Sequence, residues 1–377
     1  MATKDKVLTL LTDSKEQVIS GEALARQCGV SRAAVWKAIT ALRNQGYSIE
    51  GSTNGGYVLK DATDVFTKEL FCTYFTREFP RFKDSHIECF KEIDSTNTYA
   101  KQLLAGSGSA PHNPQSTLSS RGLSQDDASP NNEEGNSGSK PYHRAIIVAE
   151  KQTAGRGRMG RVFYSPEKTG IYLSVIYSPD SGIREPAQIT AFSAVAVCRA
   201  IQKLCGVEPA IKWINDIFIQ GKKAGGILTE GFTNFETGII ETAIIGIGVN
   251  IEDNPEAFPQ EVQHVVTSLA HSSGTKVDRC ALAAEIAGNT LQILTEDSAT
   301  VMEEYKRRSF LIGKQLTVYP VIGDEATAYS ALVRDIDQHA NLVVELADGS
   351  YKTLSSGEVS ITSVSYTHLT LPTTIGV

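Results

Sequence analysis

The segment 155–161, GRGRMGR, contains the residues of this chain best suited to binding an anion. Glycine lets backbone amides approach an anion closely, while Arg156, Arg158 and Arg161 add charge and fork-shaped donors that match phosphate or carboxylate. The glycines fit the GxGxxG pattern of dinucleotide-binding turns, but that pattern requires a helix at the last glycine. A β-branched and aromatic segment, 169–177, follows instead. The sequence therefore predicts an anion-binding loop between strands, with a solvated basic turn as the alternative.

A second group of charged residues lies around the hydrophobic run 217–219. Lys212 and Asp216 precede this run, and Lys223 and a diglycine follow it. A short apolar run between polar turns is typical of a strand in a hairpin. We therefore expect a β-hairpin whose charged groups converge near one end.

Two weaker motifs flank these groups. The short polar side chains of 94–97 suit a helix N-cap before 98–104. The segment 244–251 is a predicted strand whose glycines allow another group to pack closely. The sequence shows no P-loop, no Ser/His/Asp arrangement and no metal-ligand cluster, which argues against hydrolase and zinc chemistry.

In their order, the motifs STN, QTAGRGRMGR, KWIND, KKAGGILTE and GIGVN resemble those of the biotin–protein ligases. The N-terminal region makes the chain similar to the bifunctional kind, which is also a biotin-operon repressor. The resemblance runs from about Lys4 to Thr362 with one insertion. Ile214 stands where the family often has proline, and Met159 where it often has another basic residue. The β-branched Ile214 can still sit in a strand, and neither departure removes a group that must do chemistry.

The resemblance implies an ATP-dependent enzyme that forms biotinyl-5′-AMP. It would transfer biotin to a lysine of the biotin carboxyl carrier protein of acetyl-CoA carboxylase, or of another biotin-dependent carboxylase. Biotin and ATP are the implied substrates, Mg²⁺ would come with the nucleotide, and no metal held by the protein alone is predicted. The adenylate-bound homodimer would repress the biotin operon by binding operator DNA. Both chemical steps concentrate negative charge, so the site needs fixed cations more than a general base.

The resemblance also implies roles for matching residues. The loop arginines would hold the adenylate phosphate and pyrophosphate, Lys223 would contact the biotin carboxylate and phosphate, and Asp216 would orient a lysine or the incoming amine. The predicted catalytic residues are Arg156, Arg158, Lys223, Lys212 and Asp216.

The neutral ureido ring of biotin needs neutral donors and acceptors, which the resemblance places at 95–97 and Gln152. Phe163 would cover adenine or biotin, and Asn250 would read the adenine. The predicted ligand-binding residues are Ser95, Thr96, Asn97, Gln152, Gly155, Arg156, Gly157, Arg158, Arg161, Phe163, Lys223, Gly225, Gly226 and Asn250.

The first 60 residues differ in charge from the rest of the chain. They carry eight Lys/Arg and five Asp/Glu, a net of +3, whereas the whole chain carries −7, which leaves −10 for the remainder. Their pattern predicts three helices, near 6–12, 20–30 and 31–43, followed by two short strands. This is a winged helix-turn-helix arrangement, whose second motif helix enters a major groove.

The third predicted helix would carry the DNA-binding residues. Its spacing directs Val35, Ile39 and Leu42 to the core, and we interpret Trp36 as a packing residue. A protein-interaction module is the alternative interpretation of this region. The predicted DNA-binding residues, within a helix-turn-helix at 20–39, are Ser31, Arg32, Ala33, Lys37 and Thr40.

The remaining sequence predicts an α/β (α+β) catalytic domain and a C-terminal SH3-like β-barrel. We expect domains at 1–65, 82–308 and 309–363. A Gly/Ser/Asn/Pro-rich insertion at 105–141 is predicted to be flexible, and 364–377 to be a non-native tail. The six cysteines form no CxxC motif, and neither a signal peptide nor a long apolar span is visible, which predicts a cytoplasmic protein without membrane association.

Two other functions compete with the bifunctional ligase. A lipoate-type adenylate-forming ligase would share the fold, but not the DNA-binding region or the GRGRxGR loop. A transcription factor that only senses a ligand would not need the arginine loop and Lys223, both of which are present.

Overall fold

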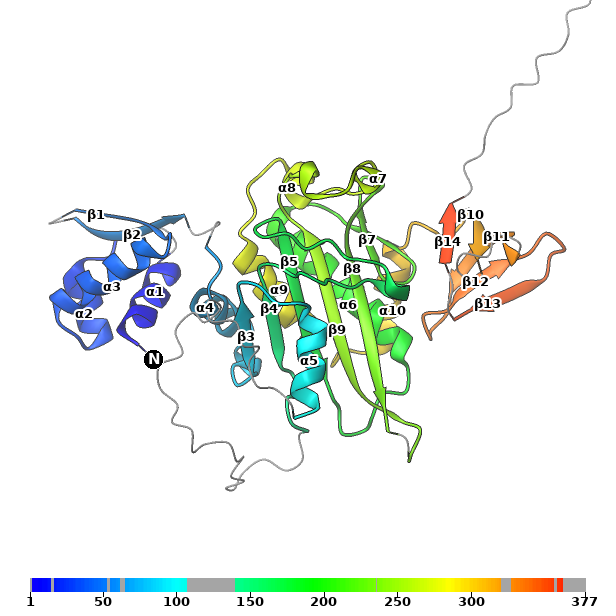
Figure 1. Cartoon of the computed structure of the whole chain (residues 1–377), viewed down its shortest axis with the longest axis horizontal. Coiled ribbons are helices and arrows are strands. Elements are labelled where there is room, and N and C mark those ends of the chain that lie inside the picture. Colours follow the sequence, from blue (N-terminus) through cyan, green and yellow to red (C-terminus); the bar gives the residue numbers. More distant parts are fainter. Residues whose placement is uncertain are drawn as a thin grey trace, which may run out of the picture. The chain divides into compact units, whose positions relative to one another are not determined.

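The computed structural model describes residues 2–14, 17–52, 55–61, 65–106, 140–234, 236–319, 327–355 and 358–361. The chain divides into two compact units, Met1–Arg308 and Ser309–Val377 (Figure 1). Among the described residues, no helix combines the length and the apolar character needed to cross a membrane. The predicted insertion, apart from its ends, and the predicted tail lie outside the described residues.

The N-terminal region folds as three helices and a two-stranded antiparallel wing, as predicted. Its elements are α1 (Thr3–Asp13), α2 (Gly21–Cys28), α3 (Arg32–Asn44), β1 (Ser48–Ser52) and β2 (Gly56–Asp61). Ser20 and Ser31 cap α2 and α3 by accepting hydrogen bonds from backbone N–H groups. Buried Val35, Ile39 and Leu42 form the core face of α3.

A seven-stranded sheet organises the rest of the first unit, with strand order β3-β4-β5-β9-β8-β7-β6. Only the pair β3–β4 is parallel. The strands are β3 (Ile87–Phe90), β4 (Ile146–Ala149), β5 (Gly170–Tyr177), β6 (Ala210–Lys212), β7 (Asp216–Ile219), β8 (Lys222–Thr233) and β9 (Ile240–Asn250). The helices are α4 (Lys68–Glu78), α5 (Thr96–Leu104), α6 (Pro186–Cys205), α7 (Gln260–Gln263), α8 (Leu269–Ser273), α9 (Arg279–Ile293) and α10 (Ser298–Arg308), with single 3₁₀ turns at Pro80–Phe82, Arg158–Gly160 and Pro255–Ala257.

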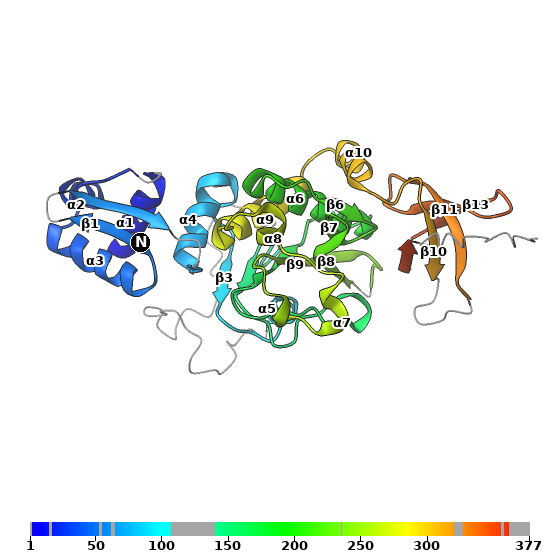
Figure 2. The same cartoon turned by 90° about the horizontal axis from the view of Figure 1, so that it is seen from above.

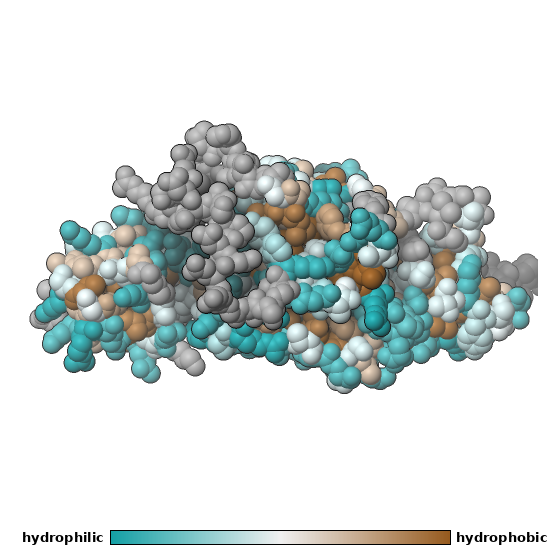
Figure 3. All heavy atoms as spheres, turned by 90° about the horizontal axis from the view of Figure 1, so that it is seen from below, coloured by the Kyte–Doolittle hydropathy of each residue, from teal (hydrophilic) through white to brown (hydrophobic). Residues whose placement is uncertain are grey.

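The two faces of the sheet are covered differently. Helices α6 and α9 pack on one face, and α5 packs on the other, as Figures 1 and 2 show. The face toward α6 is lined by alternating apolar residues such as Ile245, Ile247 and Val249, all buried. This face supplies the main core, because α6 is apolar over most of its length. The surface in Figure 3 instead shows hydrophobic residues in separate patches among hydrophilic ones.

Contacts within the first unit also join the N-terminal region to α4. The Tyr47 hydroxyl lies 2.7 Å from Thr67 Oγ1, and Thr67 caps α4. Lys4 forms an ion pair of 3.6 Å with Glu69 of α4. Helix α4 in turn packs against α9.

The second unit is a five-stranded antiparallel sheet of order β13-β12-β11-β10-β14. Its strands are β10 (Gln315–Tyr319), β11 (Tyr329–Ile336), β12 (Leu342–Glu345), β13 (Tyr351–Leu354) and β14 (Glu358–Ile361). A hairpin turn at Asp348 and Gly349 joins β12 and β13, and Gly349 adopts a φ of 80° there. Among the described residues β13 and β14 are the two sheet edges and do not pair, so the predicted closed barrel is not observed.

The strand position that a β-branched side chain would allow for Ile214 is not observed. Ile214 does not lie in a strand but in the turn between β6 and β7, and the Trp213–Ile214 peptide bond is cis. The buried Tyr305 of α10 donates a hydrogen bond of 3.1 Å to the Ile214 carbonyl. This hydrogen bond from α10 therefore helps to stabilise the turn.

Candidate functional site

The arginine loop forms an irregular hairpin on the α5 side of the sheet. Phe163 N–H donates to the Gly155 carbonyl at 2.9 Å, and Gly157 N–H donates to the Arg161 carbonyl at 2.7 Å. Met159 at its tip has a φ of 60° in place of extended backbone. The segment after the loop continues into β5, which confirms that no helix opens at the last glycine.

The second charged group converges as predicted. Lys223 Nζ lies 2.7 Å from Asp216 Oδ1, because β7 and β8 are antiparallel neighbours. The arginine loop reaches the same turn, since Arg158 Nη1 donates to Asn215 Oδ1 at 3.1 Å. Asn215 is fixed by its own Nδ2, which donates to the Ile227 carbonyl at 3.0 Å. Two cations thus meet at one end of the hairpin.

Glycines of β8 and β9 lie beneath these groups; the surface of Gly226, Gly246 and Gly248 is called the glycine floor. A Cβ on Gly226 would lie 3.5 Å from Lys223 Nζ, and one on Gly248 would lie 2.4 Å from the Phe163 ring. A Cβ on Gly246 would lie 2.4 Å from Asn97 Oδ1. The prediction that other groups pack closely on the glycines of β9 is therefore confirmed. The sheet presents bare backbone where side chains from three separate segments meet.

Next to this floor lies a buried polar network that starts at the first turn of α5. Thr96 N–H donates to Gln152 Oε1 at 2.9 Å, and Gln152 Nε2 donates to Ser165 Oγ at 2.9 Å. Ser174 Oγ lies 2.7 Å from Thr96 Oγ1 and 2.6 Å from Asn97 Oδ1. Ser95 caps α5 and so positions the next two residues. The network consists of neutral side chains in direct mutual contact.

Glu230 sets the orientation of the Asn97 amide. Asn97 Nδ2 donates to Glu230 Oε2 at 2.8 Å, and Lys101 Nζ lies 2.7 Å from Glu230 Oε1. Because an ionised carboxylate only accepts, Nδ2 must face Glu230 and Oδ1 must face Ser174. Burial raises the pKa of Glu230, but the hydrogen bonds from Lys101 and Asn97 outweigh burial and the pKa is lowered. The carboxylate is therefore ionised at neutral pH.

The segment after β9 closes over the end of the same region. Asn250 is buried and its Nδ2 donates to the Thr267 carbonyl at 3.2 Å. Thr267 N–H donates to the Lys223 carbonyl, and Lys223 N–H donates to the Val265 carbonyl, each at 2.9 Å. The backbone segment 265–267 thereby contacts both Lys223 and Asn250.

The remaining predicted residues lie at the rim. Arg156 is exposed, and its Nη2 donates to Thr98 Oγ1 of α5. Arg161 is exposed, and Lys212 is half-buried opposite Asp216 in the β6–β7 pairing. Gly225 is buried, and a Cβ there would lie 2.6 Å from the Gly248 carbonyl oxygen.

Sequence reasoning missed several residues of this network. Asn215 and Glu230 lie inside quoted motifs, so their polar side chains next to charged residues were an available signal. Ser174 was visible as the polar residue within the otherwise apolar strand β5. The missed residues are Thr98, Ser165, Ser174, Asn215 and Glu230.

In the N-terminal region, the predicted DNA-binding residues lie at the free surface of α3. Arg32, Ala33 and Lys37 are exposed, and Thr40 is half-buried with its hydroxyl donating to the Trp36 carbonyl at 3.0 Å. The interpretation of Trp36 as a packing residue is wrong, because this side chain is 58 % exposed. Its position, four residues after Arg32, places it on the outer stripe of the helix and not on the stripe of Val35 and Ile39.

Comparison with known proteins gives two family matches. Residues 122–250 match the biotin/lipoate A/B protein ligase family, and residues 3–58 match an HTH domain family. The bifunctional ligase/repressor BirA of Bacillus subtilis is 33% identical over 72% of this chain and 72% of its own length. The protein of the same description from Escherichia coli is 26% identical over 95% of this chain and 97% of its own.

Solved structures share the fold. The biotin protein ligase of Aquifex aeolicus, in complex with biotin and ATP, has a TM-score of 0.55 at 20% identity and covers 74% of this chain and 98% of its own. That likeness shows a shared fold, whereas the sequence identity to the Bacillus protein over most of the chain shows common descent. The chain therefore belongs to the biotin/lipoate A/B protein ligase family and, with its N-terminal HTH domain, to the bifunctional ligase/repressors within it.

Proposed function

We propose that this chain is an ATP-dependent biotin–protein ligase. The biotin carboxylate attacks the α-phosphate of ATP, which releases pyrophosphate and leaves biotinyl-5′-AMP. A lysine amine of a biotin carboxyl carrier protein, from acetyl-CoA carboxylase or another biotin-dependent carboxylase, then attacks the acyl carbon and releases AMP. The observation that carries this proposal is the meeting of Arg158, Lys223 and the neutral network of Thr96, Asn97 and Gln152 around one glycine floor.

The two cations suit phosphate binding because of their present partners. Arg158 is held by the neutral amide of Asn215, so moving to a phosphate exchanges one hydrogen bond to a neutral acceptor, about 1.5–3 kcal/mol, for bonds to an anion. Lys223 is held by Asp216, which keeps its ammonium at the floor instead of in solvent. We propose that both stabilise the charge of the adenylation transition state, with Arg156, Arg161 and Lys212 adding charge at the rim.

The neutral network suits the ureido ring of biotin, which offers neutral N–H donors and a carbonyl acceptor. Ser95, Thr96, Asn97 and Gln152 would bind this ring, and Phe163 and Asn250 would contact the adenine side. Among the described residues no group of three or more His, Cys, Asp or Glu could hold a metal ion. We therefore propose that Mg²⁺ arrives on the nucleotide phosphates, where it supplies charge neutralisation.

Transfer of labelled biotin to a purified carrier domain tests this function. We expect incorporation that requires both ATP and Mg²⁺, and no incorporation when lipoate replaces biotin. Lipoate transfer without biotin transfer would establish the lipoate-type ligase instead. Absence of both biotin transfer and lipoate transfer by a folded protein would contradict the proposal.

We further propose that the biotinyl-adenylate-bound homodimer binds a palindromic operator and represses the biotin operon. Support comes from the HTH match and from the exposed polar face of α3. If the adenylate favours the dimer, two N-terminal regions bind one duplex, so operator affinity rises with biotin plus ATP and far less with either alone. Equal affinity in all conditions, measured by electrophoretic mobility shift, would contradict this regulatory half.

Three finer points complete the proposal. The DNA-binding domain spans 1–65, the ligase domain 82–308 with an insertion at 105–141, and the C-terminal domain 309–363. We propose that the C-terminal sheet closes as an SH3-like barrel, supported by its five antiparallel strands. The six free cysteines of the chain, all in the first unit, suit a reducing compartment such as the cytoplasm.

A further inference from the structure

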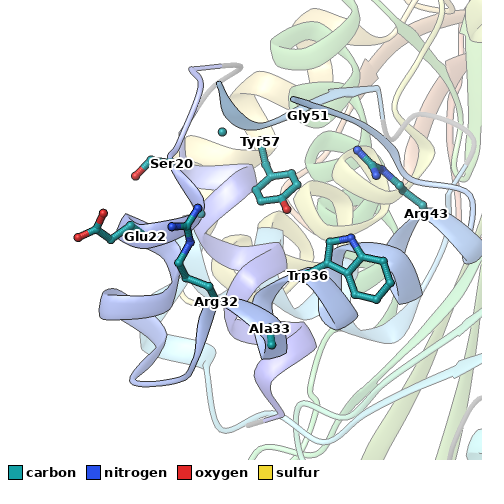
Figure 4. A pocket seen from close by; sticks show the side chains of 10 residues that line it. Ser20, Glu22, Arg32, Ala33, Trp36, Arg43, Gly51 and Tyr57 are labelled. Carbon is teal, nitrogen blue, oxygen red and sulfur yellow. The ribbon is translucent and has the colours of Figure 1, made fainter. Parts of the chain in front are cut away.

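A groove in the N-terminal region lies between α3 and the β1–β2 wing. Its volume is about 620 Å³, and its lining includes Arg32, Trp36, Arg43, Tyr57 and Glu22. Figure 4 shows Arg32, Trp36 and Arg43 on α3 around the ring of Tyr57. A volume of this size exceeds what one side chain fills and falls in the range of ligand sites. Trp36 enlarges the apolar area exposed there, since it is 58 % exposed.

The groove is built into the fold and not left by loose packing. The Tyr57 ring occupies the space over Gly51, where a Cβ would lie 2.6 Å from the ring. Arg43 is fixed across the groove by its Nε, which donates to the Ile49 carbonyl at 2.8 Å. Gly56 has a φ of 86°, and a Cβ there would lie 2.5 Å from the Ile19 carbonyl oxygen. Two glycines and one anchored arginine therefore fix the wing relative to α3.

The spacing of the lining residues matches a polyanionic strand. Arg32, Trp36 and Arg43 lie at positions i, i+4 and i+11 of α3, on one stripe of the helix. The two guanidinium-bearing positions are roughly 16 Å apart along the helix axis. Cation, aromatic ring and cation in this order complement phosphate, base edge and phosphate, because arginines bind phosphates and an exposed apolar ring in the major groove can contact the thymine methyl group.

We infer that this groove receives one strand of the duplex, with Trp36 as a specificity-determining residue and Arg43 as a phosphate ligand. The inference rests on the proposed repressor function and adds to it two residues and the wing surface. A nucleic acid fits better than an acidic peptide, because the arginines are spaced along a helix that fits a major groove.

The test uses the full chain with biotin and ATP, and a duplex that the wild-type protein selects from a random pool. A random duplex in the same salt serves as the nonspecific reference. Trp36→Ala is expected to weaken binding to the selected duplex about tenfold or more, and binding to the random duplex less than about twofold. Arg43→Ala is expected to weaken both equally and to reduce the salt slope of log K by about one. Tyr351→Ala, which removes a 65 % exposed aromatic from the second unit, is the matched control and should change neither.

Tryptophan fluorescence gives an independent readout. The chain has two tryptophans, and Trp213 is only 5 % exposed, so a DNA-dependent change reports on Trp36. We expect the selected duplex to quench the wild-type signal and to leave the signal of Trp36→Phe unchanged.

Two failures are distinguishable. If the wild type selects no sequence, the repressor half of the proposed function fails and the groove inference fails with it. The second failure needs a wild type that does select a duplex. If Trp36→Ala binds that duplex equally well, and the duplex does not quench the wild-type fluorescence, only the groove inference is overturned. An unchanged melting temperature of both variants excludes unfolding as the cause of a loss.

Discussion

The two faces of strand β9 show how one element serves stability on one side and ligand binding on the other. Ile245, Ile247 and Val249 point toward α6 and are at most 3 % exposed. Burying each such side chain contributes about 1.5–3 kcal/mol. On the opposite face, Gly246 and Gly248 carry no side chain, and other segments pack directly on their backbone. Strand β9 can therefore leave Gly246 and Gly248 bare at the site, because its other face supplies much of the packing.

The largest expected effect lies at the cation end of the bare face. Arg158→Ala removes one charge and its donor fork from the proposed phosphate site. Biotin-dependent pyrophosphate exchange should fall by about 10²–10³, equivalent to about 3–4 kcal/mol of transition-state stabilisation. Lys223→Ala should also lose activity, while the N-terminal region keeps the DNA binding that does not depend on the adenylate.

Arg334→Ala is the matched control, since it removes an exposed arginine of the second unit that pairs with Glu345. Near wild-type exchange by a folded Arg158→Ala protein would contradict the assignment of the loop to the phosphate.

A single methyl added to the bare face should also impair activity. Gly248→Ala places a Cβ 2.4 Å from the far edge of the Phe163 ring, so the ring must move. We expect kcat/KM for biotin to fall about tenfold, about 1.4 kcal/mol. The melting temperature should change little, because the Phe163 side chain can rotate away from the added methyl group. A melting temperature that falls in step with activity would mean that this glycine serves folding and not the site.

The orientation of Asn97 should affect binding more than catalysis. Glu230→Gln offers an amide that can donate or accept, so Asn97 can flip and present the wrong group to the network. The KM for biotin should rise severalfold, with kcat nearly unchanged. Lys101→Met breaks the ion pair with Glu230 but leaves the carboxylate on Asn97, so its KM should stay close to that of the wild type. An equal rise of the KM in both variants would show that loss of the ion pair, and not the orientation of the Asn97 amide, causes the effect.

The lowered pKa of Glu230 predicts how the KM for biotin depends on pH. Burial acts to raise the pKa of Glu230, but its hydrogen bonds lower it overall from the ordinary value of 4.5. The stabilisation from its ionised form is therefore present above about pH 4.5 and is lost as the pH falls through the lowered folded pKa. The wild-type KM for biotin should show no inflection from this group across neutral pH, and an inflection that Glu230→Gln abolishes would show the opposite shift.

The smallest effect is expected on the packed face, one residue away from Gly248. Ile247→Val removes one buried methyl and should lower the free energy of unfolding by about 0.5–1.5 kcal/mol. Activity per folded molecule should stay unchanged, because the side chain points away from the floor. Chemical denaturation measures the first quantity and pyrophosphate exchange the second; a loss of exchange in this variant would show that the two faces are coupled.

Much of the local structure could be predicted from the sequence. Ser31 caps α3, and Lys223 meets Asp216 in a hairpin, because capping chemistry and short apolar runs between turns are local signals. The N-terminal three-helix and wing arrangement and the α/β body are confirmed for the same reason. Local signals of this kind could not predict whether the C-terminal sheet closes into a barrel, because closure depends on pairing between its two edge strands.

Residue types and their spacing alone establish the motifs, the charge difference between the N-terminal region and the rest, and the glycines of β9. Long-range packing brings Ser174 and Glu230 to Asn97, since these residues come from β5, β8 and α5 and meet through sheet pairing. It also decided that Ile214 occupies a turn held by Tyr305, and that Trp36 faces the wing groove and not the core. Residue type and spacing fix which face of an element is apolar, but the neighbour that covers a polar or aromatic side chain is fixed by long-range packing.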